Sequence, residues 1–330
     1  AFLLMLSLGI SPIVAIGGAV AVAFCSYNMQ IIQVGHNTKM MAIAWLPWVL
    51  AAVIFTYRTA LSMFRVNADE SPKSTAWKSW LPQTILGASL FGMALNFQIK
   101  ANHIQISYYL AIIIFCYAIG LFIWLVADKE RRHGIAKFFA ASALLLTIGI
   151  IGIGANANKL IPTYNYSKHT MRGGSELAVE SSENSGKTKG LDLEYATAWS
   201  YGWQELPNMM IPDFNGGASS GAVNYSRSET IKLLKQYGQP NLREVAKSLP
   251  LYWGPQPFTA GPMYMGAITI FLFILGLFMC KGRDKWWILA ATVIAILLGV
   301  GNHFMPFTKF WYYYMPFYSK FRTVSIALII

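Results

Sequence analysis

Apolar runs of about 20 residues recur along this chain, and they constrain its fold more than any other feature. A helix needs roughly 20 mostly apolar residues to cross the hydrocarbon core of a bilayer. Charged residues make up only 12% of the chain, about half the share found in soluble globular domains. The sequence therefore predicts an all-α integral membrane protein, a polytopic helical bundle of about seven or eight spans. The candidate spans are residues 2–26, 40–57, 81–99, 104–127, 135–154, 263–280 and 286–301, with an eighth that begins near Thr323.

A long polar stretch, residues 155–262, interrupts the apolar runs and divides the chain into three parts. Residues 1–154 hold five of the spans, residues 155–262 form a loop domain, and residues 263–330 hold two spans and the start of another. Within the loop domain, apolar residues recur at helical spacing over residues 226–249, and Pro240 interrupts them. Because proline breaks a helix interior, this pattern predicts two short helices rather than one.

Basic residues concentrate in three of the short loops between spans, and this asymmetry predicts the orientation. Loops 58–80, 128–137 and 281–285 together hold eleven Lys and Arg residues, whereas the alternate short loops hold five. Under the positive-inside rule the first set is cytoplasmic, which makes residues 155–262 extracytoplasmic. Orientation also accounts for the net charge of +12, so no nucleic-acid partner is expected.

Polar and basic residues gather at the span ends that this topology places on the outer side. Basic groups there can hold a phosphate, and arginine can do so through two parallel hydrogen bonds. The alternative is helix capping, snorkelling and contact with anionic lipid headgroups. The candidate phosphate-binding or substrate-binding residues are His36, Asn37, Lys100, His103, Lys320 and Arg322.

The spans contain no Asp or Glu, which argues against an ion-coupled transporter. A carboxylate for acid–base chemistry would therefore come from the outer loop domain. Glu205 and Asp213 lie in an aromatic, turn-rich segment, WSYGWQELPNMMIPDFNGG, that we expect to be ordered, and they are the candidate catalytic residues. The alternative for each is a surface or capping carboxylate. Asp213 and Asn215 alone do not specify a metal site, so no metal ligands are assigned.

Five long strings are distributed along the chain between residues 33 and 325, and they include parts of the loop domain. They read QVGHNTKMMAIAWLPWVLA, QIKANHIQISYYL, LDLEYATAWSYGWQELPNMMIPDFNGGAS, LYWGPQPFTAGPMYMGAITIFLFILGLF and MPFYSKFRTVS. Together they resemble the bacterial YfhO-type membrane protein family. That family is similar to the polytopic GT-C glycosyltransferases, which use a polyprenyl-phosphate-linked sugar on the extracytoplasmic side, and it has been linked to the decoration of cell-envelope polymers.

The resemblance implies a GT-C-like fold in the bacterial inner (cytoplasmic) membrane. It implies a glycosyltransferase that moves a sugar from a polyprenyl-phosphate-linked donor to a cell-envelope polymer acceptor, with membrane lipids as the remaining partners. The alternatives are a lipid or polymer translocase and a non-catalytic envelope-assembly protein. The matching positions are the GHN at residues 35–37, the ANH at residues 101–103, Glu205, and the KFR at residues 320–322.

The same resemblance implies that this chain is a fragment. Family members begin with an additional span and an extracytoplasmic loop that carries an acidic residue. In GT-C enzymes such an early-loop carboxylate is the usual catalytic base or metal contact, so we expect the main catalytic carboxylate to precede Ala1. A divalent metal ion is the one cofactor that this interpretation leaves open.

Overall fold

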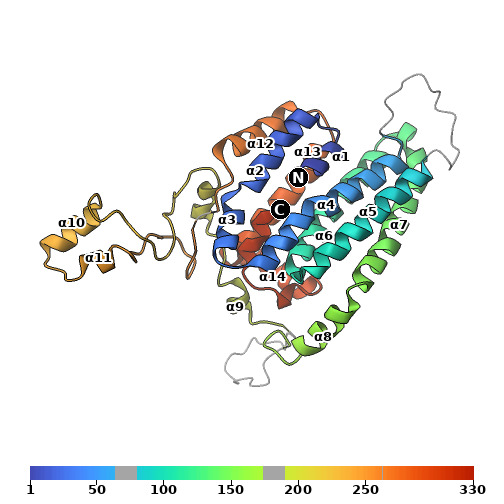
Figure 1. Cartoon of the computed structure of the whole chain (residues 1–330). Helices are drawn as coiled ribbons and strands as arrows, with labels where there is room; N and C mark the ends of the chain where they lie inside the picture. Colours follow the sequence, from blue (N-terminus) through green and yellow to red (C-terminus); the bar gives the residue numbers. More distant parts are fainter. Residues whose placement is uncertain (64–79, 174–189, 262) are drawn as a thin grey trace.

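The computed structural model describes residues 1–63, 80–173, 190–261 and 263–330, and these residues form helices and no strand (Figure 1). Long helices pack side by side in a bundle, and the loop domain extends from one of its ends. The long helices are α4 (Asn37–Ala60), α5 (Leu81–Lys100), α6 (Ile104–Val126), α7 (Ile135–Gly154) and α13 (Asp284–Val300). The shorter α-helices are α1 (Phe2–Ser7), α2 (Pro12–Ala23), α3 (Ser26–Gln33), α8 (Ala157–Ser167), α9 (Leu193–Thr197), α10 (Glu229–Gln236), α11 (Leu242–Val245), α12 (Ala267–Met279) and α14 (Met305–Tyr314). Short 3-10 turns are η2 (Lys129–Gly134), η3 (Trp203–Met209), η4 (Gly301–Phe304), η5 (Tyr318–Lys320) and η6 (Val324–Ile329).

Five helical segments in the described ranges are long and apolar enough to cross a bilayer, as expected for a helical membrane protein. The helix α12 is apolar but has only 13 residues. The fifth expected span, residues 135–154, coincides with α7. The five segments are Pro12–Gln33, Asn37–Ala60, Ile104–Val126, Lys129–Gly154 and Asp284–Tyr314.

The prediction that residues 2–26 form a single spanning helix is wrong. Instead, α1 ends at Ser7 and α2 begins at Pro12. Gly9 adopts φ of +85°, a conformation that ends a helix, and a proline at the start of α2 cannot donate a hydrogen bond back to α1. The sequence GISP therefore separates two helices within one apolar run.

The eighth expected span begins differently from the prediction. Thr323 adopts φ of +59°, and the residues after it form η6, a 3-10 segment of six residues. This segment packs against α13: a Cβ placed on Gly299 would lie 2.8 Å from Leu328. The segment is buried, so packing against α13 rather than lipid exposure explains its apolar sequence.

Tyrosine and phenylalanine side chains pack among the aliphatic residues at the centre of the bundle. The ring of Tyr57 in α4 stacks on Phe138 of α7 at 5.1 Å, and its hydroxyl lies 2.8 Å from the Ser142 hydroxyl. Tyr117 of α6 approaches the same ring at 6.0 Å. Aromatic pairs of this geometry stabilise a core by about 0.5–1.5 kcal/mol each beyond the area they bury. They hold α4, α6 and α7 at a fixed spacing.

Small residues at a four-residue spacing on α5, Thr84, Ala88 and Gly92, mediate close helix contacts. The hydroxyl of Thr84 lies 3.3 Å from the hydroxyl of Thr59 in α4, and Ala88 is fully buried. A Cβ on Gly152 of α7 would lie only 2.8 Å from the backbone oxygen of Gly92. Without a hydrophobic driving force in lipid, such close packing is what associates membrane helices.

The described basic residues of the three expected cytoplasmic loops meet at one end of the bundle. Arg58 donates a 2.9 Å hydrogen bond to the carbonyl of Ser7. The guanidinium groups of Arg131 and Arg283 lie 4.3 and 4.1 Å from the ring centre of Trp124. The basic residues of these loops that lie outside the described residues are Arg65, Lys73 and Lys78.

Cysteine labelling tests the predicted orientation. We expect a single cysteine at Lys235, on the exposed surface of α10, to react with a membrane-impermeant thiol reagent in intact cells. A cysteine at Lys129, in the basic loop before α7, should react only after permeabilisation, because the positive-inside rule places that loop in the cytoplasm. Cys25, Cys116 and Cys280 are first replaced by serine. Equal labelling of both sites in intact cells would refute the orientation.

The loop domain contains the two short helices that the Pro240 interruption predicts, α10 and α11. Figure 1 shows both extending away from the bundle. Isolated bridges pair Gly216 with Tyr252 and Gly221 with Leu249, so the two sides of this arm are joined at its base. The rest of the described loop lies over the end of the bundle opposite to the basic loops.

Candidate functional site

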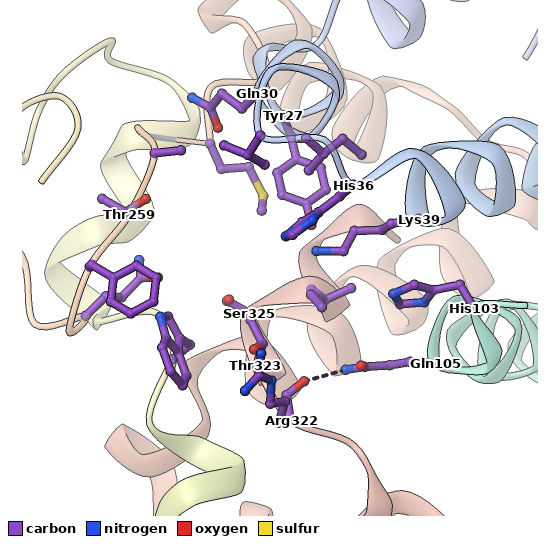
Figure 2. Close-up of a pocket in the computed structure, with 18 of the residues that line it drawn as sticks. Tyr27, Gln30, His36, Lys39, His103, Gln105, Thr259, Arg322, Thr323 and Ser325 are labelled. Atoms are coloured by element: carbon purple, nitrogen blue, oxygen red, sulfur yellow. Dashed lines mark hydrogen bonds between the residues drawn. The ribbon is translucent and has the colours of Figure 1, made fainter. Parts of the chain in front are cut away.

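A cavity of about 910 Å³ lies where the loop domain meets the ends of α3, α4 and α6 (Figure 2). Four stretches of chain form most of its wall: residues 34–39, residues 199–201, residues 256–261 and residues 322–326. The beginning of α6 contributes His103 and Gln105. This volume is typical of pockets that hold small organic ligands.

The turn between α3 and α4 supplies one basic wall. Gly35 has φ of +78°, which a residue without a Cβ adopts readily, and the chain reverses there so that α4 begins at Asn37. His36 precedes the first helical residue, and Lys39 lies within the first turn. Figure 2 shows the imidazole of His36 and the ammonium of Lys39 directed into the same space.

The turn between α5 and α6 places a second imidazole beside the first. Asn102 has φ of +56°, a conformation that asparagine tolerates better than most residues, and His103 then precedes α6. Gln105, in the first turn of α6, donates hydrogen bonds of 2.9 Å to the carbonyl of Arg322 and of 3.1 Å to the Tyr109 hydroxyl. The first of these bonds fixes the backbone of Arg322 beside α6 (Figure 2).

The guanidinium of Arg322 lies between the bundle and the loop domain. It donates a hydrogen bond to the hydroxyl of Tyr195 and lies 5.5 Å from the ring centre of Trp199. The next backbone amide, that of Thr323, donates to the carbonyl of Ala196 at 3.2 Å. Tyr195 and Trp199 thus contact one side of the Arg322 guanidinium, which leaves its remaining N–H donors available to the cavity that it lines.

Aromatic side chains form the loop side of the cavity. Trp199 and Phe258 meet edge to face, with ring centres 5.1 Å apart, and both line the cavity. Thr259, adjacent to Phe258, lies across the cavity from Lys39 (Figure 2). The cavity therefore has flat apolar rings on the loop side, and Lys39 and His36 on the bundle side.

The described lining residues include three cations, namely Lys39, Arg172 and Arg322, and no carboxylate. Burial lowers the pKa of His36, and the charges of Lys39 and Arg322 lower it further. Burial also lowers the pKa of His103, to about 4, with Lys39 as the next cause. Near neutral pH the two imidazoles are therefore uncharged hydrogen-bonding groups beside fixed cations, an arrangement suited to an anion.

Acid should destabilise the protein through His103. Its folded pKa of about 4 lies below the ordinary 6.5, so the unfolded chain takes up the proton first as pH falls. We expect the free energy of unfolding to have its full value above pH 6.5. It should fall by about 2 kcal/mol between pH 6.5 and 4, a figure reduced to allow for the partial exposure of His103. Thermal unfolding in detergent across that range should be less pH-dependent for His103→Gln. The exposed His303→Gln serves as the matched control, and an equal flattening in both variants would contradict the assignment.

Four of the six expected phosphate-binding residues line the cavity: His36, Asn37, His103 and Arg322. The structure does not place the other two in its wall. Lys100 is exposed at the end of α5, and Lys320 lies in η5, two residues before Arg322. Three lining groups that the sequence did not single out are Lys39, Arg172 and Gln256. The sequence could have identified Lys39 as a candidate, because it lies three residues after His36 at the same helix end.

The carboxylate of Glu205, a candidate catalytic residue, lies outside the cavity wall and has structural partners. Its side chain is only 1% exposed. It accepts hydrogen bonds from the backbone amide of Gly202 at 2.8 Å, from the Tyr252 hydroxyl at 2.6 Å and from the Gln256 amide at 3.1 Å. Because Gln256 lines the cavity, Glu205 acts on the site by holding that wall in place.

Asp213, the other candidate catalytic carboxylate, is exposed in a turn with φ of +53° and does not line the cavity. Its neighbour Asn215 is buried and exchanges hydrogen bonds with Asn208, at 3.0 and 3.2 Å, rather than facing Asp213 as a co-ligand. Within the described ranges, no group of three or more His, Cys, Asp and Glu side chains could hold a metal ion. The described residues therefore assign no metal ligands.

Comparison of the chain with protein-family models, with curated proteins and with solved structures finds no match. The case for a function therefore depends on the cavity and on the residues that line it.

Proposed function

We propose that this chain is a membrane glycosyltransferase of GT-C type with about seven or eight spans. It would lie in the bacterial cytoplasmic membrane with residues 155–262 outside the cytoplasm. It would transfer a sugar from a polyprenyl-phosphate-linked donor to a cell-envelope polymer. The observation that supports this most is a cavity lined by Lys39, Arg172 and Arg322, without a described carboxylate, at the end of an apolar bundle.

The two walls fit the two parts of such a donor. The cations on the bundle side suit the phosphate, and Arg322 can bind it through two N–H groups. The rings of Trp199 and Phe258 offer an apolar face for a sugar ring. The exposed apolar surface of α2 and α3 beside the cavity offers a lipid-facing path for a polyprenyl chain.

The proposed reaction breaks one bond and forms one. An acceptor hydroxyl attacks the anomeric carbon, the bond from that carbon to the phosphate oxygen breaks, and a base takes the hydroxyl proton. Negative charge builds up on the departing polyprenyl phosphate. Lys39 and Arg322 stabilise that charge, and fixed cations in a site of low dielectric are effective in this role.

Transfer of radiolabelled sugar from a polyprenyl-phosphate donor in proteoliposomes tests the proposal. We expect wild-type protein to move label to an envelope-polymer acceptor and the Arg322→Ala variant to do so far more slowly. Movement of the intact donor between leaflets without transfer would instead identify a translocase. Absence of both activities, with donor binding retained, would point to a non-catalytic envelope-assembly protein.

A further inference from the structure

A second, smaller cavity lies at the opposite end of the bundle, where α4 and α6 end and α7 begins. Its volume is about 140 Å³. A phosphodiester, about the size of two or three water molecules of roughly 30 Å³ each, fits this space. The apolar lining residues are Leu61, Met63, Trp124 and Leu125, and the basic ones are Arg131, His133 and Lys137.

The helix ends that meet at this cavity position the basic groups around it. Arg131 donates a 3.3 Å hydrogen bond to the carbonyl of Trp124 and forms a 2.9 Å ion pair with Asp128. Arg283 approaches the Trp124 ring as well, at 4.1 Å. The ammonium of Lys137 lies 5.8 Å from the ring centre of Trp80, and no described carboxylate pairs with it. Positive charge thus exceeds negative charge among the described groups here.

The surroundings match a lipid rather than a free solute. The helices flanking the cavity present exposed apolar side chains close in sequence to its lining residues, Ile123 on α6 and Phe139 on α7. Phe139 is in ring contact with Phe122, at 5.9 Å, so these two helices share a continuous apolar surface beside the basic cavity. A ligand with an anionic head and acyl chains satisfies both features together. Basic pockets between membrane helices on the cytoplasmic side bind such headgroups in other proteins.

We propose that the cavity formed by Trp124, Arg131, His133 and Lys137 binds the phosphodiester headgroup of an anionic phospholipid. Lys137 supplies the charge that the described acidic residues do not balance, and Arg131 and Trp124 form the adjacent wall. Leu61 is part of the apolar lining. This site is separate from the larger cavity and does not depend on the function proposed for it.

Lipid retention in nanodiscs tests the site. The whole chain is reconstituted in phosphatidylcholine containing a minor fraction of phosphatidylglycerol, and retained lipids are counted by native mass spectrometry. We expect the Lys137→Gln variant to retain about fivefold less phosphatidylglycerol than wild type, from the value of one basic group near an anionic lipid. Lys137→Arg, which keeps the charge, should retain it. Lys129→Gln removes the same charge from η2, eight residues earlier and outside the cavity, and it should change retention little.

The outcomes separate this site from its alternatives. Equal losses for Lys129→Gln and Lys137→Gln would show diffuse surface attraction and overturn the proposal. In a second experiment, inorganic phosphate is added to the protein in pure phosphatidylcholine nanodiscs, and the unfolding temperature is measured. Stabilisation by millimolar phosphate as large as that by phosphatidylglycerol would overturn a lipid as the ligand. Stabilisation by phosphatidylglycerol alone, reduced in Lys137→Gln, is the expected result.

Discussion

Replacing Glu205 with alanine is expected to destabilise the loop domain by about 2–4 kcal/mol. The carboxylate is buried and accepts hydrogen bonds from Gly202, Tyr252 and Gln256. Alanine would leave the buried amide of Gly202 without a partner, at a cost of about 1–3 kcal/mol, and would remove the acceptor of the half-buried Tyr252 and Gln256 donors. The measurement is thermal unfolding in detergent, together with limited proteolysis of residues 190–261.

The matched control is Glu194→Ala, which removes an exposed carboxylate from the same domain. It should change stability by less than about 0.5 kcal/mol. Glu205→Gln should lie between the two, because it keeps one acceptor oxygen. If Glu205→Ala unfolds at the wild-type temperature yet abolishes sugar transfer, the carboxylate acts in the chemistry and the structural assignment is wrong.

Replacing Arg322 with alanine should weaken binding of the polyprenyl-phosphate donor about 10- to 100-fold, the value of a hydrogen bond to a charged group. Arg322→Lys should recover only part of this, because a lysine cannot form the two parallel hydrogen bonds. The measurement is donor affinity in nanodiscs, with the unfolding temperature recorded for each variant because Arg322 also contacts Tyr195 and Trp199.

Lys320→Ala is the control for Arg322. It removes the same charge two residues away, outside the cavity wall. Its donor affinity should stay near that of wild type. If Lys320→Ala weakens binding as much as Arg322→Ala, general attraction to the basic surface explains the effect, and the proposed phosphate site is wrong.

Helix bounds followed from the sequence where one physical signal dominated. Residues 135–154 are an uninterrupted apolar run that follows a basic loop, and α7 has those bounds. A four-residue spacing of small side chains is a similarly simple signal, and α5 has one where Gly92 contacts Gly152. The prediction failed at residues 2–26, because hydropathy counts apolar side chains and does not register the backbone turn at Gly9 and Pro12.

The sequence predicts the ends of the helices better than it predicts which basic side chains come together in the cavity. The sequence places Lys100 and His103 at one helix end, but it does not say toward which side each points. The left-handed turn at Asn102 directs His103 into the cavity, while Lys100 stays on the exposed surface of α5. Arg172 arrives from the residues after α8, and no local pattern specifies such a long-range approach.

The cavity wall also has a consequence for biosynthesis. Its first lining residue, Tyr27, and its last, Ile326, are about 300 residues apart, which is roughly 15–60 s of translation at about 5–20 residues per second. During that interval α3, α4 and α6 are already made, while Arg322 and the backbone that Gln105 binds have not been synthesised. An anionic ligand therefore meets its complete set of cations only on a bundle whose last segment has packed against α13. Under the proposed function, nascent chains that still lack Arg322 have no competent site with which to sequester the donor.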